Sequence, residues 1–363
     1  MPASTGDSLA DYGGVLAAPR RRRLLPIAVV GLTAAVAAAV VLAVAVHGSA
    51  IGAPVATLTD PASQGVSSVA FSPGGTILAV GDENGSSYLY DVATRRRIAT
   101  LTDSPSGQVM SIAINRDGTM LATADELSIT CLWDVGSGRR IATLADPGTD
   151  QQNTSVAFSP DGTLVATGDD FGRTYVWNVT TRHVIFTLTD PIHGQVDAIA
   201  FSPDGKTIAT GDADGPVYLW HASDGRHYAT LTNHAVQEID SLAFSPDGRA
   251  LAAGTGNNST HLWDLATGRQ IAVVTNPNGS SIGPPTTSVA FSPDGSELAT
   301  GGGDGTVRLW NAATRQLHAT LTVPLVSLGR DGSCSVTSVA FSPDGKTIAI
   351  GDCNGRSYLK RTD

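Results

Sequence analysis

SVAFSPDGSELATGGGDGTVRLWNAATRQLHATLT, residues 288–322, is one copy of a sequence repeat that occurs seven times from Val66 onward. A second clear copy is AIAFSPDGKTIATGDADGPVYLWHASDGRHYATLT, residues 198–232. The apolar anchor of the repeat recurs at Phe71, Ile114, Phe158, Phe201, Phe244, Phe291 and Phe341, about 43 residues apart in the middle of the chain. A repeat of this length predicts one four-stranded propeller blade, and seven repeats predict a ring of seven blades.

Each repeat divides into four short strands, which we name a to d. In the copy at 198–232, AIAFS, TIATG, PVYLW and YATLT are apolar or alternating runs, separated by Gly-containing turns. Such runs with turn residues about every ten positions predict an antiparallel sheet. In this fold the d–a and b–c connections share one face of the ring, here the top face. The a–b and c–d turns share the bottom face.

These repeats resemble the WD40 repeat family from Val55 onward. The family's Trp-Asp pair stands at Trp133-Asp134 and Trp263-Asp264. Its Gly-His pair before strand a is replaced in four repeats by Asp60-Pro61, Asp146-Pro147, Asp190-Pro191 and Asn276-Pro277. The resemblance implies an all-β, seven-bladed propeller that binds other proteins. The replaced pair predicts that the family's buried His–Asp hydrogen-bond network is absent from most blades.

Ring closure is expected from the two ends of the repeat region. The last repeat stops at SYLKRTD and supplies strands a, b and c. The sequence VATLTD, residues 55–60, matches strand d of other repeats almost letter for letter. We therefore expect it to pair with the last blade, which would otherwise present an unpaired strand edge.

A hydrophobic segment precedes the propeller. Residues 24–46 carry no charge over 23 positions, which is long enough for a helix to span a bilayer. Arg20 to Arg23 end a polar tail, residues 1–23, and the linker at 47–54 contains no Lys or Arg. The positive-inside rule then predicts a single-pass anchor in the cell membrane, with the N-terminus cytoplasmic and the propeller, residues 55–363, outside the cytoplasm. A signal peptide cleaved near Gly48-Ser49-Ala50 is the alternative.

The amino-acid composition limits the classes of partner that the protein can bind. The formal net charge of −10 disfavours a nucleic-acid partner, which would need a basic patch. The scarcity of Lys beside Arg, with abundant Ala and Gly, is typical of a GC-rich bacterial genome.

Acidic side chains are predicted to gather on the top face. The d–a loops contribute four aspartates, Asp60, Asp103, Asp146 and Asp190. Each alone is a common turn residue, but a summed acidic field would steer cationic partners. We therefore expect this face to bind a protein or peptide.

The mouth of the central channel is where the repeats diverge most toward ionisable groups. Asp197 and Asp240 occupy equivalent positions in two neighbouring strands a, and His193, His234 and Glu238 lie in the adjoining loops. Asp197, His234 and Asp240 are therefore candidate partner contacts as well. A metal-dependent enzyme could also use such a cluster. No catalytic residue, resident metal or cofactor is predicted, because the repeats contain no nucleophile with a His at matching spacing.

Two of the three cysteines are placed to pair. Cys334 precedes the last strand a and Cys353 lies in the b–c turn of the same blade, so both belong to the top face. We expect a Cys334–Cys353 disulfide in an oxidising compartment.

Two function classes follow. The first is a membrane-anchored scaffold or sensing platform outside the cytoplasm, similar to the sensor propellers that follow the transmembrane helix of some bacterial Ser/Thr kinases, although no kinase domain is present. The second is an exported propeller enzyme, a metal-dependent hydrolase or lactonase-like protein, that uses the cluster around Asp197 and Asp240 in the fourth and fifth repeats.

Overall fold

The structure is a computed structural model that describes residues 51–52, 54–59, 63–102, 107–147, 152–192, 194–232, 238–275, 286–323 and 335–363. These residues form strands and turns, and among them is no helix that could cross a bilayer. The predicted tail and membrane helix, residues 1–46, lie outside the described residues.

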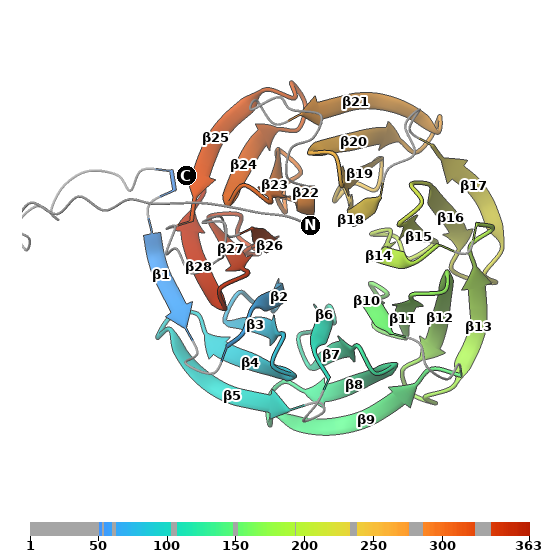
Figure 1. Cartoon of the computed structure of the whole chain (residues 1–363), viewed down its shortest axis with the longest axis horizontal. Coiled ribbons are helices and arrows are strands. Elements are labelled where there is room, and N and C mark those ends of the chain that lie inside the picture. The colour runs from blue at the N-terminus through green and yellow to red at the C-terminus, as the bar shows by residue number, and fades with distance from the viewer. Residues whose placement is uncertain are drawn as a thin grey trace, which may run out of the picture. The chain divides into compact units, whose positions relative to one another are not determined.

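Seven four-stranded antiparallel sheets form the ring (Figure 1). The inner strands a are β2 (Val66–Phe71), β6 (Val109–Ile114), β10 (Asn153–Phe158), β14 (Val196–Phe201), β18 (Ile239–Phe244), β22 (Thr286–Phe291) and β26 (Val336–Phe341). Strands b are β3 (Ile77–Asp82), β7 (Met120–Asp125), β11 (Leu164–Asp169), β15 (Thr207–Asp212), β19 (Ala250–Thr255), β23 (Glu297–Gly302) and β27 (Thr347–Asp352). Strands c are β4 (Ser86–Asp91), β8 (Ile129–Asp134), β12 (Arg173–Asn178), β16 (Val217–His221), β20 (Ser259–Asp264), β24 (Thr306–Asn311) and β28 (Arg356–Arg361). The outer strands d are β5 (Arg96–Thr102), β9 (Arg139–Ala145), β13 (Val184–Thr189), β17 (His227–Leu231), β21 (Arg269–Thr275), β25 (Leu317–Thr322) and β1 (Pro54–Thr59). We number the blades 1 to 7 from β2 to β26, and the predicted all-β, seven-bladed propeller is confirmed.

The first strand closes the ring. β1 pairs antiparallel with β28 as the outer strand of blade 7, with Thr57 opposite Tyr358 and Leu58 opposite Ser357. Figure 1 shows β1 beside β28 at the left of the ring. Blade 7 therefore has its four strands and leaves no edge of β28 unpaired, as the sequence predicted.

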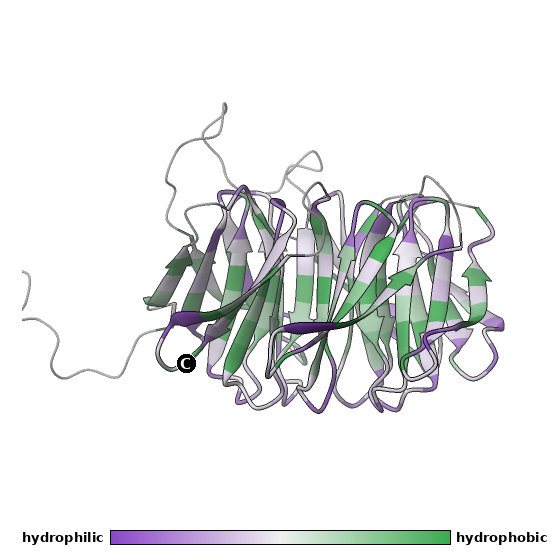
Figure 2. Cartoon of the chain, turned by 90° about the horizontal axis from the view of Figure 1, so that it is seen from below, coloured by the Kyte–Doolittle hydropathy of each residue, from purple (hydrophilic) through white to green (hydrophobic). Residues whose placement is uncertain are grey.

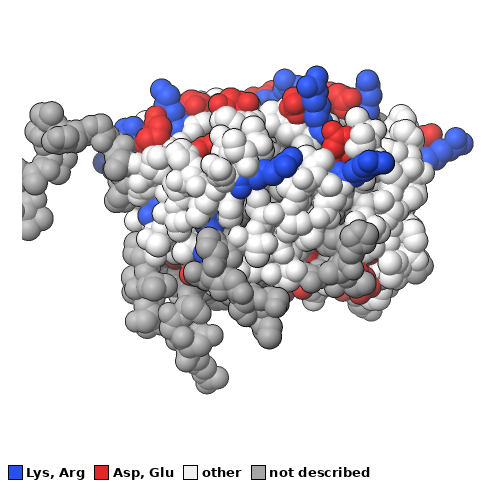
Figure 3. All heavy atoms as spheres, turned by 90° about the horizontal axis from the view of Figure 1, so that it is seen from above, with Lys and Arg blue, Asp and Glu red and all other residues white. Residues whose placement is uncertain are grey.

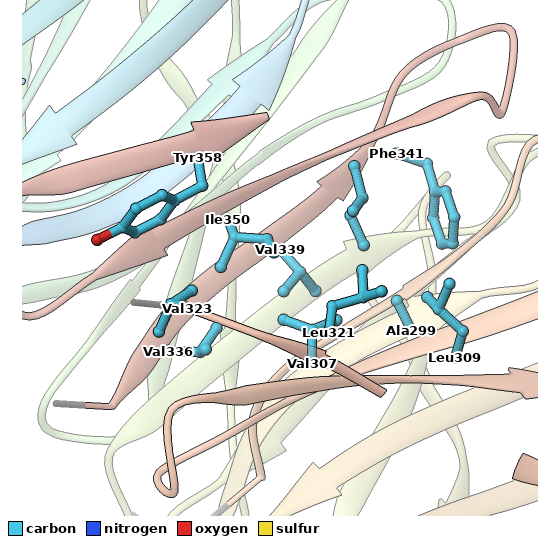
Figure 4. Close-up of a cluster of buried hydrophobic side chains, with 11 residues drawn as sticks. Ala299, Val307, Leu309, Leu321, Val323, Val336, Val339, Phe341, Ile350 and Tyr358 are labelled. Atoms are coloured by element: carbon cyan, nitrogen blue, oxygen red, sulfur yellow. The ribbon is translucent and has the colours of Figure 1, made fainter. Parts of the chain in front are cut away.

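The hydrophobic core lies between blades and not within a single sheet. One cluster joins Leu309 and Leu321 of blade 6 to Val339 and Ile350 of blade 7 (Figure 4). Strands b are the most deeply buried, with five consecutive buried residues in each of the seven blades. Burial of each such Leu or Ile side chain contributes roughly 1.5–3 kcal/mol, so apolar packing at the joints between blades is a large contribution to the stability.

The FSPDG phrase builds the a–b turn. In blade 3, Ser159 Oγ accepts the backbone N–H of Leu164 at 2.9 Å and donates to Asp161 Oδ1 at 2.5 Å. Asp161 Oδ1 in turn accepts the N–H of Thr163 at 3.0 Å. The same Ser and Asp contacts recur in blades 4, 5, 6 and 7. The serines of this phrase are thus turn formers.

Polarity follows this architecture. Hydrophobic segments lie along the strands and hydrophilic segments lie mainly at the turns (Figure 2). Figure 3, in which the bottom face is uppermost, shows Lys and Arg interspersed with Asp and Glu on that face. Pairs such as Lys206–Asp204 and Arg226–Asp224 are part of this mixture.

Candidate functional site

The seven strands a surround a central cavity of about 190 Å³. Its wall near the top face is formed by the second residue of each strand a, namely Ser67, Met110, Thr154, Asp197, Asp240, Thr287 and Thr337. This is the channel mouth. Five of its seven side chains are uncharged polar or apolar, so blades 4 and 5 alone bring carboxyl groups to it.

A β-bulge sits at this position in every blade. The register between strands a and b shifts between Asn153 and Ser155 in blade 3, and equivalent shifts occur in the other six blades. A bulge leaves its extra residue without a ladder partner and redirects the side chain. The bulge therefore explains why these seven side chains meet in the channel.

Threonines at the bulge connect two of the blades to the next blade. Thr287 Oγ1 of blade 6 donates to the carbonyl oxygen of Val336 in blade 7 at 2.5 Å and lies 3.2 Å from the oxygen of Gly301. Thr154 in blade 3 makes the same contacts with Val196 and Gly168. In blades 3 and 6 the bulge position thus offers a hydroxyl donor to a backbone acceptor of the neighbouring blade, whereas the hydroxyls of Ser67 and Thr337 in blades 1 and 7 are buried without a hydrogen-bond partner among the described residues.

Asp197 and Asp240 place acceptors where the threonines place donors. Gln195 Nε2 donates to Asp197 Oδ1 at 2.6 Å. The Oδ2 atoms of Asp197 and Asp240 are buried, and within the described part of the chain neither has a hydrogen-bond partner. These two oxygens are available to donors of a ligand.

The environment favours the protonated form of both carboxyl groups. The pKa of Asp240 is raised to about 8, mainly by burial and then by the charges of Glu238 and Asp197. Burial likewise raises the pKa of Asp197 to about 7, against the hydrogen bond from Gln195. Two neighbouring carboxyl groups with such pKa values are stabilised by a cation or a strong donor placed between them.

A second ring, of serine bridges between neighbouring strands a, is interrupted at two joints, and one of them is the joint between blades 4 and 5. The serine after the bulge accepts a backbone N–H of the next blade at five joints, for example Ile199 N–H to Ser155 Oγ at 3.1 Å. In blade 4 this residue is Ala198, which has no hydroxyl group. The joint between blades 4 and 5 therefore lacks the serine bridge at the place where it carries Asp197 and Asp240.

Two of the four aspartates that the sequence places in the d–a loops lie inside the protein. Asp146 and Asp190 are 7% and 1% exposed. Trp177 Nε1 donates to Thr167 Oγ1 at 3.1 Å, and this hydroxyl donates to Asp146 Oδ1 at 3.2 Å. Blade 4 repeats the chain with Trp220, Thr210 and Asp190. These two acids thus anchor their loops to strands b and c, in contrast to the exposed acidic face expected from the sequence.

Both buried acids have raised pKa values. Burial raises the pKa of Asp146 to about 8, with an added contribution from the charge of Asp169. Burial and then the charge of Asp212 raise the pKa of Asp190 to about 7. The Oδ2 atoms of Asp190 and Asp212 are buried without a hydrogen-bond partner among the described residues.

Several of the other predicted site residues lie outside the part of the chain that the structure describes. Asp60, Asp103, His193, His234 and Cys334 lie outside the described residues, so their roles stay predictions. Cys353 is disulfide-bonded, whereas Cys131 is buried and is not part of a disulfide. The pairing of Cys353 with Cys334 stays a prediction.

A metal centre has no support from the described residues. Among them no group of three His, Cys, Asp or Glu side chains is arranged to hold a metal ion. The histidines proposed to complete a site with Asp197 and Asp240 are outside the described ranges.

Sequence reasoning missed the burial of Asp146 and Asp190, and it missed the bulge. For the first, a signal was present, because both residues replace a Gly-His pair whose histidine is buried in the resembling family. The bulge depends on the register of two strands and has no signature in one repeat.

Comparison with known families agrees with the geometry. The family model described as WD domain, G-beta repeat, matches residues 52–91 and 95–134. The model described as IFT122 first beta-propeller matches residues 152–359, more than half of the chain. No curated protein matches the sequence.

Proposed function

The chain belongs to the family of WD40-type β-propellers, and on this premise we propose that it is a non-enzymatic platform that binds a protein or peptide at the channel mouth. Propellers of this family generally bind protein partners. The finer parts of the proposal are a single-pass anchor at residues 24–46, a propeller outside the cytoplasm and no nucleic-acid partner. Their support is the uncharged segment after four arginines and the net charge of −10.

The observation that carries the binding site is the pair Asp197 and Asp240. Their buried Oδ2 atoms lack donors within the described part of the chain. The threonines at the equivalent positions in blades 3 and 6 are hydrogen-bonded, and the hydroxyls of Ser67 and Thr337 in blades 1 and 7 are unpartnered among the described residues but carry no charge. A buried acceptor without a partner costs about 1–3 kcal/mol, which a ligand donor would recover. We expect the partner to insert a cationic side chain, an amine or a guanidinium, between these carboxyl groups.

The test is cross-linking in native membranes, followed by purification of the tagged full-length protein and mass spectrometry. A parallel sample carries Asp197→Asn and Asp240→Asn. The matched control carries Asp204→Asn and Asp247→Asn, two exposed aspartates in the a–b turns of the same blades.

A partner recovered with the parent and the control but lost with the channel variant would support the proposal. Equal recovery of a partner from all three samples would mean that the partner binds at a surface other than the channel mouth. Bound metal in the purified protein, lost with His193→Ala and His234→Ala, would favour the exported enzyme instead.

A further inference from the structure

The bottom face has a ring of proline–glycine contacts. The proline of each a–b turn lies against the turn glycine of the next blade, so that a Cβ built on Gly118 would be 3.2 Å from Pro73 Cδ. The same contact recurs with a proline at 3.4–3.7 Å for Gly75, Gly205, Gly248, Gly295 and Gly345. Six of the seven joints are closed in this way around the lower end of the channel.

The joint between blades 2 and 3 breaks this ring. Blade 2 has Asn115-Arg116 where the other blades have Ser-Pro. The nearest atom to a Cβ on Gly162 is Asn115 Nδ2 at 3.8 Å, and no proline reaches this glycine. One joint therefore lacks the apolar closure that the other six share.

A second departure coincides with the first. The last residue of strand a is Phe in six blades but Ile114 in blade 2. A cavity of about 320 Å³ opens here, lined by Ile114, Arg116, Phe158, Ser159, Pro160 and Pro203. We name it the bottom pocket. A smaller anchor and a missing proline thus leave a space between apolar side chains that belong to three successive blades.

The charge at the rim of the bottom pocket is supplied by Arg116. Its side chain is exposed and makes no salt bridge within the described residues. The adjacent Asp117 is engaged elsewhere, because its Oδ1 accepts the N–H of Thr119 at 2.9 Å and the hydroxyl of Thr119 at 2.5 Å. An apolar cavity with one unpaired guanidinium at its rim suits an apolar group that is followed by a carboxylate.

We propose that the bottom pocket binds a peptide segment of a partner protein in which a bulky apolar side chain is followed by an acidic residue. The apolar side chain fills the space beside Ile114, Phe158 and Pro160. The carboxylate pairs with Arg116. This site lies on the face opposite the channel mouth and does not depend on the function proposed above.

The test uses methyl-resolved NMR of the full-length protein with isoleucine methyl groups labelled, because Ile114 lines the pocket. The probes are three blocked tetrapeptides, Gly-Phe-Asp-Gly, Gly-Phe-Lys-Gly and Gly-Ala-Asp-Gly. We expect Gly-Phe-Asp-Gly to shift the Ile114 methyl signal in a saturable manner. Gly-Phe-Lys-Gly should bind about three-fold more weakly, since it loses one exposed ion pair. Gly-Ala-Asp-Gly should produce no saturable shift.

Two variants separate the contributions. Arg116→Ala should reduce the affinity for Gly-Phe-Asp-Gly to that for Gly-Phe-Lys-Gly. Ile114→Phe combined with Arg116→Pro restores the residues of the other six blades and should abolish binding, which is then followed through the Phe ring signals of the peptide. Because six blades already carry these residues, the double variant is expected to fold. Equal affinity for the Asp and Lys peptides, or unchanged binding to the double variant, would overturn the proposal.

Discussion

Asp146 and Asp190 belong to the Asp-Pro pairs that replace the family's Gly-His pair, and both take part in buried hydrogen-bond chains. Each accepts the hydroxyl of a threonine that itself accepts the indole N–H of a tryptophan. Both acids are buried beside another carboxyl group, Asp169 and Asp212 respectively. A neutral, protonated acid fits this setting better than a carboxylate.

Stability should therefore fall as the pH rises. The pKa of Asp190 is about 7 in the folded protein, above the ordinary value of 3.8. The folded state then binds more protons than the unfolded state between about pH 4 and 7, and the free energy of unfolding decreases through that window. Asp190→Asn, which mimics the protonated acid, should raise this free energy by about 1–3 kcal/mol at pH 8 and by clearly less at pH 5, near the start of that window. Urea denaturation at the two pH values measures both effects.

The control for this prediction is Asp134→Asn. The carboxylate of Asp134 accepts the N–H and the hydroxyl of Ser137, and these bonds lower its pKa. This variant should lose stability at pH 8, which is the opposite sign. A gain for Asp190→Asn that is the same at pH 5 and pH 8 would contradict the assignment of a protonated Asp190.

At the scale of the element, β1 carries the closure of blade 7. Leu58 is 5% exposed and packs with Val66, Leu78 and Leu359 between blades 7 and 1. Leu58→Ala should lower the free energy of unfolding by about 2–4 kcal/mol, as large-to-small changes in a packed core do. Thermal or urea denaturation measures the loss.

Thr57→Ala provides the matched control in the same strand. Thr57 is exposed, and its substitution should change the free energy of unfolding by less than about 0.5 kcal/mol. Similar effects of the two substitutions would mean that β1 does not close the ring through its buried face.

The elements themselves were largely predictable from sequence. Strand positions follow from the repeat, and the place of β1 follows from its match to the strands d of other blades. The burial and contacts of single side chains were less predictable. Asp146 and Asp190 look like exposed turn residues, because burial depends on how a loop returns over strands b and c. Arg116 visibly departs from Ser-Pro, but only the stacking of neighbouring turns shows that a cavity results.

At the scale of the whole molecule, the ring is uneven. Serine bridges connect neighbouring strands a at five joints, and Ala198 stands at the serine position between blades 4 and 5. That joint also holds the carboxyl groups of Asp197 and Asp240. If the ring opens, we expect it to open there.

Ala198→Ser should strengthen this joint. A hydroxyl there would accept the backbone N–H of Leu242, as Ser155 does for Ile199, and should add about 0.5–1.5 kcal/mol to the free energy of unfolding. Hydrogen exchange should show a fast Leu242 amide in the parent and a slower one in the variant. The reverse exchange, Ser155→Ala, should accelerate the Ile199 amide. If the Leu242 amide already exchanges as slowly as that of Ile199, the joint is not the weak point.

Closure by β1 also has a consequence for biosynthesis. The partner of β1 is β28, whose last residue is Arg361, so a ribosome must add about 300 residues before the first strand of the propeller can find its place. At roughly 5–20 residues per second, this wait lasts on the order of 15–60 s. Throughout that interval β1 remains unpaired in the nascent chain, where a chaperone or a neighbouring nascent propeller can bind it.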